Sequence, residues 1–132
     1  MSTEETPRDM LASAAARGDL ERIRNLLAEG VPIDADDGVR PLHDAVEMGE
    51  LESLRLLLHH GSNIESIFQT LTPLAHAVDV ACDAVNQGFD LRTEAIGILL
   101  KAGANPEPGI NMALKYGCGQ LAEAIRRYSR QQ

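Results

Sequence analysis

Residues 40–61 read RPLHDAVEMGELESLRLLLHHG, and the pattern predicts two short antiparallel helices with a glycine at each turn. Pro41 suits the first position of a helix, where its missing N–H costs nothing. Gly49 suits the left-handed conformation that often ends a helix. Leucines at helical spacing then line one face of a second helix that stops at Gly61. A hairpin this small cannot bury its own apolar face, so the sequence predicts copies stacked beside it.

Such copies lie on both sides of this stretch. The segment 72–77, TPLAHA, repeats the start of the hairpin, and 98–105, ILLKAGAN, repeats its end. Upstream, NLLAEG at 25–30 aligns with LLLHHG at 56–61. On these residues the chain resembles the ankyrin repeat family, whose unit of about 33 residues carries a T-P-L-H-x-A signature. The resemblance covers residues 7–128 and implies an all-α solenoid of about four stacked helix-turn-helix repeats.

A length of 132 residues suits a single domain, 1–132, with repeats at about 7–33, 34–66, 67–104 and 105–128. Helices are expected at 7–16 and 20–28, the first capped by Thr6, and at 111–117 and 120–128 in the last repeat. In that last helix Leu121, Ala124 and Ile125 are expected to face inward.

The second repeat departs from the family pattern at Arg40, where the resemblance implies a threonine that caps the first helix. Losing that cap should cost about 1 kcal/mol unless Asp36 or Asp37 takes its place. The exchange Arg40→Thr is therefore expected to raise the melting temperature.

The third repeat carries an insertion. Eighteen residues separate Arg40 from Leu58, but 28 separate the equivalent Thr72 and Leu100, so ten extra residues fall within 79–91. Apolar residues continue there at helical spacing, which predicts a first helix lengthened by two to three turns. It should end at Gly88, with Asp90 as the N-cap of the next helix. A disordered loop is the alternative, although the segment contains few helix breakers.

The formal charge of −8 is unevenly placed: residues 1–66 hold 14 acidic and 6 basic side chains, and residues 67–132 hold 6 of each. This distribution argues against nucleic acid or an anionic membrane as partner. It suits electrostatic attraction of a basic protein, and simple solubility explains it equally well.

The two cysteines, Cys82 and Cys118, have no short motif spacing, which indicates a reducing compartment rather than a disulfide framework. The first five residues lack a basic segment and an apolar run, and no stretch approaches the ~20 apolar residues of a membrane span. A cytoplasmic monomer without cofactor is expected, with secretion that needs no signal peptide left open.

Four histidines raise the question of a metal site. The resemblance gives His43 a structural role, and adjacent His59 and His60 point to different sides of a helix end. No His or Cys cluster has ligand spacing, so no metal is expected. His76 could contact Asp44 of the preceding repeat. Cys82 is interpreted as a packing cysteine whose pKa the flanking aspartates raise.

The resemblance implies that partners bind to the finger turns between repeats and to the exposed edge of the first helices. In this sequence the matching candidates are Asp34, Asp36, Asp37, Val39, Asp44, Glu47, Met48, Phe68, Gln69, Leu71, His76, Asp79, Val80, Lys115 and Tyr116. An acidic rim around apolar anchors would suit a basic protein. Alternatively, Phe68 and Leu71 pack between repeats and serve only the fold.

These residues predict a non-catalytic module that binds a basic protein partner through its concave acidic face. Two alternatives remain open: a bacterial immunity or inhibitor-type protein that occludes a toxin or enzyme, and an enzyme or metal-dependent factor using the region of His76, Asp79 and Cys82. A stabilising accessory subunit is a further possibility.

Overall fold

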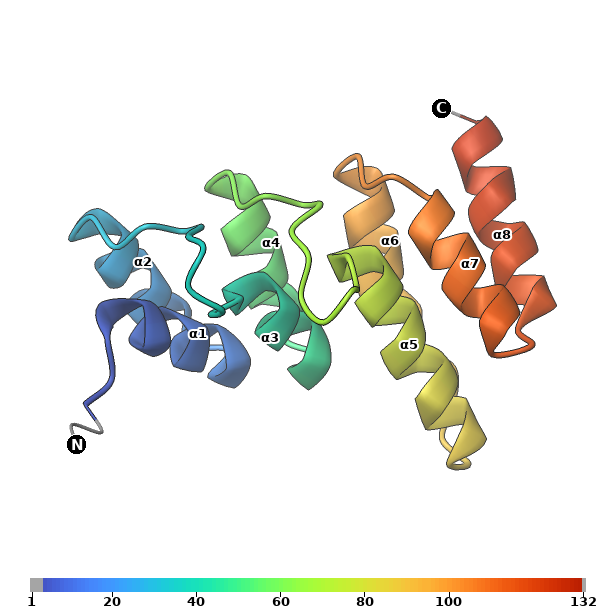
Figure 1. The fold of residues 1–132 in the computed structure, drawn as a ribbon, viewed down its shortest axis with the longest axis horizontal. Helices are drawn as coiled ribbons and strands as arrows, with labels where there is room; N and C mark the ends of the chain where they lie inside the picture. The colour runs from blue at the N-terminus through green and yellow to red at the C-terminus, as the bar shows by residue number, and fades with distance from the viewer. Residues whose placement is uncertain (1–3, 132) are drawn as a thin grey trace. The chain divides into compact units, whose positions relative to one another are not determined.

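The computed structural model describes residues 4–131; the first three residues of the polar N-terminal stretch and Gln132 lie outside the described part. Within this range the chain forms eight helices and no strand beyond one isolated bridge (Figure 1). The helices are α1 (Pro7–Arg17), α2 (Leu20–Ala28), α3 (Pro41–Met48), α4 (Leu51–His59), α5 (Pro73–Asn86), α6 (Glu94–Lys101), α7 (Glu107–Lys115) and α8 (Gly119–Arg130). None of the helices described is both long enough and apolar enough to cross a membrane.

The helices belong to two compact units, one ending at Asn63 with α1–α4 and one beginning at Ile64 with α5–α8. Each unit holds two helix pairs. In the first unit α1 packs on α3, and in the second α5 packs on α7, so the first helices of successive pairs lie side by side. Each pair thereby buries the apolar face that it could not bury alone, which confirms the predicted all-α helix-turn-helix repeats.

The predicted turn chemistry is present in the first unit. The Thr6 hydroxyl accepts the N–H of Asp9 at 3.0 Å, and the Asp9 carboxylate accepts the N–H of Thr6 at 3.0 Å, which forms a capping box. Gly18 and Gly49 end α1 and α3 with φ of 74° and 68°, where a side chain would be strained. Leu11 and Leu54 are fully buried in the core between the pairs.

The side chain of Arg40 does not cap α3. Instead, its guanidinium donates to the carbonyls of Ala35 and Val39, each at 3.1 Å. Threonine at this position would gain a cap worth about 1 kcal/mol but lose both hydrogen bonds. Because Arg40 has these partners, Arg40→Thr is no longer expected to raise the melting temperature.

The insertion lengthens α5, but by less than predicted. The helix has 14 residues against eight in α3, so it is six residues longer, a little under two turns instead of two to three. Gly88, with φ of 91°, follows the end of the helix as expected. Asp90 is not the N-cap of α6, because residues 89–93 run without regular structure and α6 begins at Glu94 after Thr93.

The last repeat also differs from its prediction. α7 begins at Glu107, four residues before the predicted Asn111, because Pro108 occupies the first turn of the helix, where a proline is tolerated. In α8, Leu121 and Ile125 are buried as expected, but Ala122 is buried in place of the exposed Ala124. Either alanine can share one helix face with Leu121 and Ile125, so sequence spacing alone does not decide which of the two is buried.

Candidate functional site

A tight turn in the second unit holds the finger residues predicted to meet a partner. Phe68 and Leu71 exchange backbone hydrogen bonds of 2.9 and 3.0 Å across Gln69 and Thr70. Both central residues have positive φ, 51° and 71°, as a two-residue hairpin turn requires. Neither is glycine, and left-handed backbone costs an ordinary residue about 1 kcal/mol. The turn keeps this strain and displays Gln69 and Thr70 to solvent.

The exposed edge of α5 meets the end of α7 through a pair of polar side chains. The Tyr116 hydroxyl, one residue past α7, donates a hydrogen bond of 2.5 Å to Oδ1 of Asp79 on α5. This bond to a carboxylate raises the pKa of Tyr116 to about 12, with burial as the second cause. The other Asp79 oxygen takes no hydrogen bond from the residues that the structure describes.

The two helices approach closely because of a buried glycine. Gly109 in α7 lies against Leu74 in α5, and a Cβ added to it would sit 2.9 Å from Cγ and Cδ2 of that leucine. Small residues let helix backbones come together, and here the approach helps to set α7 beside the edge that carries Asp79. The position of the Asp79–Tyr116 pair therefore follows from the packing of the core.

The turn, α5 and α7 together enclose a pocket of about 290 Å³. Its lining consists of Gln69, Leu71, Asp79, Met112, Lys115 and Tyr116. Five of these six were predicted as partner-binding residues, and the structure brings them together from three separate segments. Met112 was missed, although it lies one turn before Lys115 and Tyr116 at the spacing that places residues on one helix face.

The pocket offers the Asp79 carboxylate to a long, positively charged side chain, and the cation Lys115 lies in the same lining. Leu71 and Met112 supply apolar contact for a methylene stem, and the open oxygen of Asp79 supplies an acceptor for a cation at its end. Its volume lies just below the range of about 300–1,000 Å³ that is typical of small-molecule sites. A pocket of this size can receive a single side chain that projects from another protein.

The other candidates of the second unit do not line this pocket. Phe68, His76 and Val80 are half-buried, and Phe68 contributes to the turn through its backbone. Phe68 and Leu71 are both half-buried, so each presents part of its side chain to solvent.

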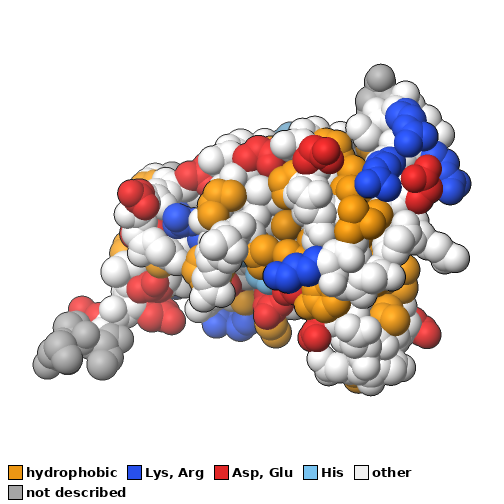
Figure 2. Space-filling model, turned by 45° about the vertical axis from the view of Figure 1, so that its right-hand side comes forward, with side chains coloured by type: hydrophobic (Ala, Val, Ile, Leu, Met, Phe, Trp, Pro, Cys, Tyr) orange, Lys and Arg blue, Asp and Glu red, His pale blue; other side chains and the backbone are white. Residues whose placement is uncertain are grey.

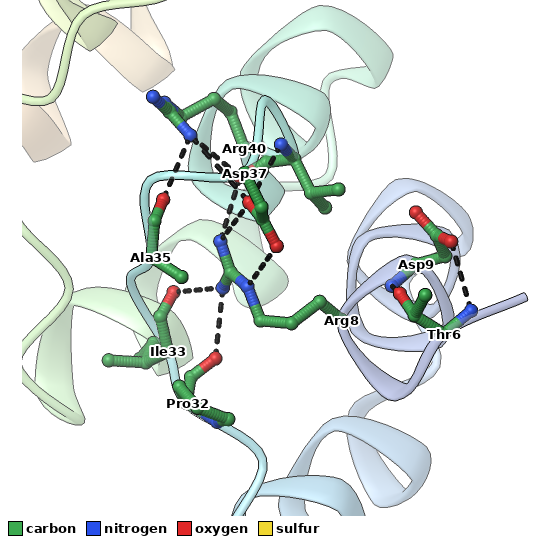
Figure 3. A network of polar contacts seen from close by, with 9 residues as sticks. Thr6, Arg8, Asp9, Pro32, Ile33, Ala35, Asp37 and Arg40 are labelled. Atoms are coloured by element: carbon green, nitrogen blue, oxygen red, sulfur yellow. Dashed lines mark hydrogen bonds and ion pairs between the residues drawn. The ribbon is translucent and has the colours of Figure 1, made fainter.

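In the first unit, Asp37 is already occupied by a contact within the chain (Figure 3). Arg8 on α1 is buried, and all five of its N–H donors are used. They reach the Asp37 carboxylate at 3.1 and 3.2 Å and the carbonyls of Pro32, Ile33 and Val39 at 2.8–2.9 Å. The hydrogen bond from Arg8 lowers the pKa of Asp37, and the Val39 N–H adds to the effect. The sequence assigned Asp37 to a partner, but its carboxylate fixes the finger 30–40 to α1.

Asp34 is likewise held within the first unit. Its carboxylate accepts the N–H of Asn63 at 2.9 Å and the Ser62 hydroxyl at 3.3 Å. Glu65, at the equivalent position of the second unit, accepts the N–H of Asn105 at 2.7 Å. A carboxylate four residues after the glycine that follows α2 or α4 thus ties one inter-repeat segment to the next. The assignment of Asp34 to a partner surface overlooked this structural role.

The remaining first-unit candidates differ in their exposure to solvent. Asp36, Glu47 and Met48 are exposed, with Met48 at 61%, while Val39 and Asp44 are half-buried. They lie outside the pocket of the second unit.

The region proposed for an enzyme or metal factor includes Cys82 on α5. Cys82 is 1% exposed, so it is a packing residue. Burial, followed by Cys118 and Asp79, raises its pKa to about 12, which leaves it protonated at neutral pH. The direction was predicted, but burial rather than the flanking aspartates is the main cause. Among the residues described, no group of three His, Cys, Asp or Glu side chains is placed to hold a metal ion.

Comparisons with known proteins match the repeats. A family model described as ankyrin repeats, three copies, matches residues 2–68. A 2-5A-dependent ribonuclease of Mus musculus is 38% identical over 56 residues, which are 40% of this chain and 8% of the ribonuclease. The chain thus spans less than a tenth of that relative, and the activity in its name is that of the mouse protein.

Proposed function

Because the chain belongs to the ankyrin repeat family, whose repeats generally mediate protein–protein interaction, we propose that it is a non-catalytic module that binds a basic protein through the pocket of its second unit. In this proposal a lysine or arginine of the partner enters between Leu71 and Met112 and reaches Asp79. Gln69 contributes polar contacts at the rim.

The observation that carries the proposal is the convergence of five predicted contact residues around one pocket that contains an open carboxylate oxygen. Asp79 is preorganised, because Tyr116 holds its other oxygen and fixes the orientation of the group. A preorganised acceptor loses little freedom on binding, which improves affinity and specificity. The net charge of −8 would also attract a basic partner from a distance.

The acidic excess of residues 1–66 favours one form of this function, an inhibitor or immunity protein that covers a basic enzyme. In that case the partner would lose activity on binding. We further propose that the module acts as a monomer in the cytoplasm, where its two thiols stay reduced.

Affinity capture from a lysate of the native cells tests the proposal with three baits. These are the unmodified protein, Asp79→Lys, which places a cation in the pocket, and Glu29→Lys, which makes the same charge change on the exposed C-cap of α2. A partner should be retained by the unmodified bait and by Glu29→Lys, lost from Asp79→Lys, and released by salt. Equal capture by all three baits would contradict a role for the pocket.

A further inference from the structure

The extended end of α5 carries apolar side chains that the fold leaves uncovered. In Figure 1 this end projects past α6 and α7 within the second unit. Residues 85–94 are all exposed, and they include Val85 at 41%, Phe89 at 68% and Leu91 at 49% exposed. We call the segment 85–94 the overhang. Residues 85–91 of the overhang belong to the insertion.

This exposure is unusual for the composition of the chain. Only four aromatic residues are present, two phenylalanines and two tyrosines, and Phe89 shows more surface than any other exposed large hydrophobic residue of the described range. Aromatic side chains dominate the energetics of protein interfaces, and apolar groups gathered on a surface mark interaction sites. Figure 2 shows one face of the molecule, on which hydrophobic side chains lie at the surface among acidic and basic ones.

The charge around the overhang restricts what can cover it. The overhang contains two acidic side chains, Asp90 and Glu94, and one basic side chain, Arg92, and Asp83 precedes it on α5. A second copy of the chain would bring two such acidic surfaces together, and like charges across an interface are costly. An anionic lipid surface would be repelled for the same reason. A protein segment that combines apolar residues with lysine or arginine complements the overhang both in its exposed apolar surface and in its negative charge.

We propose that the overhang is a second docking surface, which binds a basic amphipathic segment of a protein partner. The apolar side of that segment covers Phe89, Leu91 and Val85, and its cations face Asp83 and Asp90. The Asp83 carboxylate is exposed and accepts a hydrogen bond of 2.8 Å from the side chain of Gln87, the C-cap of α5. The surface uses no pocket residue as an anchor, so it stands independently of the proposed function.

Selection from a random-peptide phage library tests this proposal on the full chain. Peptides are selected on the unmodified protein and screened against Phe89→Ser/Leu91→Ser, whose positions are exposed and outside the core. Met48→Ser is the matched control, because Met48 is 61% exposed but lies in the first unit. Leu71→Ser alters the pocket without changing charge and therefore separates the two surfaces.

The selected peptides should carry apolar residues at helical spacing together with lysine or arginine. Their dissociation constants, from fluorescence anisotropy, should rise about tenfold or more with Phe89→Ser/Leu91→Ser and stay unchanged with Met48→Ser and Leu71→Ser. The proposal is overturned if no selected peptide depends on Phe89 and Leu91, or if the dependent peptides are acidic. It is also overturned if the unmodified chain dimerises or sediments with anionic vesicles and the double variant does not. Loss of binding with Leu71→Ser alone would point to the pocket instead.

Discussion

Replacing Gly109 by alanine tests the close approach of α5 and α7 on which the pocket depends. In an unobstructed helix, alanine is more favourable than glycine by about 1 kcal/mol. At Gly109 the new Cβ would lie 2.9 Å from two atoms of Leu74 and 3.6 Å from Cγ2 of Val78. Leu74 is fully buried and cannot move into solvent, so the overpacking should cost about 1–3 kcal/mol. The net result lies between no change and a loss of about 2 kcal/mol.

Gly97 provides the control, because it lies within α6 of the same unit and an added Cβ there meets no atom within 4 Å. Gly97→Ala should therefore gain the full helix preference of about 1 kcal/mol. Urea unfolding of both variants should separate their midpoints by about 1 M, with Gly97→Ala the more stable. If Gly109→Ala is stabilised as much as Gly97→Ala, the two helices do not approach as closely as described, and the reasoning is wrong.

Three further predictions concern single side chains. Arg8→Ala should lower the free energy of unfolding by about 2 kcal/mol, because it removes the five hydrogen bonds of a buried guanidinium and leaves the carbonyls of Pro32 and Ile33 without their donor; an unchanged urea midpoint would contradict this. Ser53→Ala should raise the melting temperature, because this hydroxyl is fully buried and has no hydrogen-bond partner among the described residues; a fall would reveal a partner. In a Tyr128→Phe background, the tyrosinate absorbance of Tyr116 should rise near pH 12, and Asp79→Asn should return its pKa toward 10. The folded state holds the Tyr116 hydroxyl proton more tightly than the unfolded state, so the stabilisation from this group is complete below pH 10 and is lost as the pH rises toward 12. An identical titration of Tyr116 with and without Asp79→Asn would exclude the Asp79–Tyr116 hydrogen bond.

Much of the fold was predictable because the repeats place proline and glycine at fixed points. The bounds of α2 agree with the prediction, and α1 and α3 begin at Pro7 and Pro41 as expected. The helix bounds were predicted less well where a proline could either begin a helix or lie in a loop. Pro106 and Pro108 suggested a stiff link, yet a proline also fits the first turn of a helix, and α7 starts earlier for that reason.

The site was only partly predictable, because sequence register places residues on an edge without showing which ones are already bonded. Register identified most of the pocket lining but assigned Asp37 to a partner. Its actual donor, Arg8, lies 29 positions away and looked like an ordinary charge at the start of a helix. The Asp79–Tyr116 pair, 37 positions apart, depends equally on tertiary packing.

Chemical-shift mapping of the captured partner on isotopically labelled protein tests the central claim most directly. The largest amide shifts should fall at the turn 68–71, around Asp79, and at 112–116, and they should disappear in Asp79→Lys while persisting in Glu29→Lys. Shifts confined to the first unit, or unchanged shifts in Asp79→Lys, would show that the partner binds elsewhere and would contradict the account.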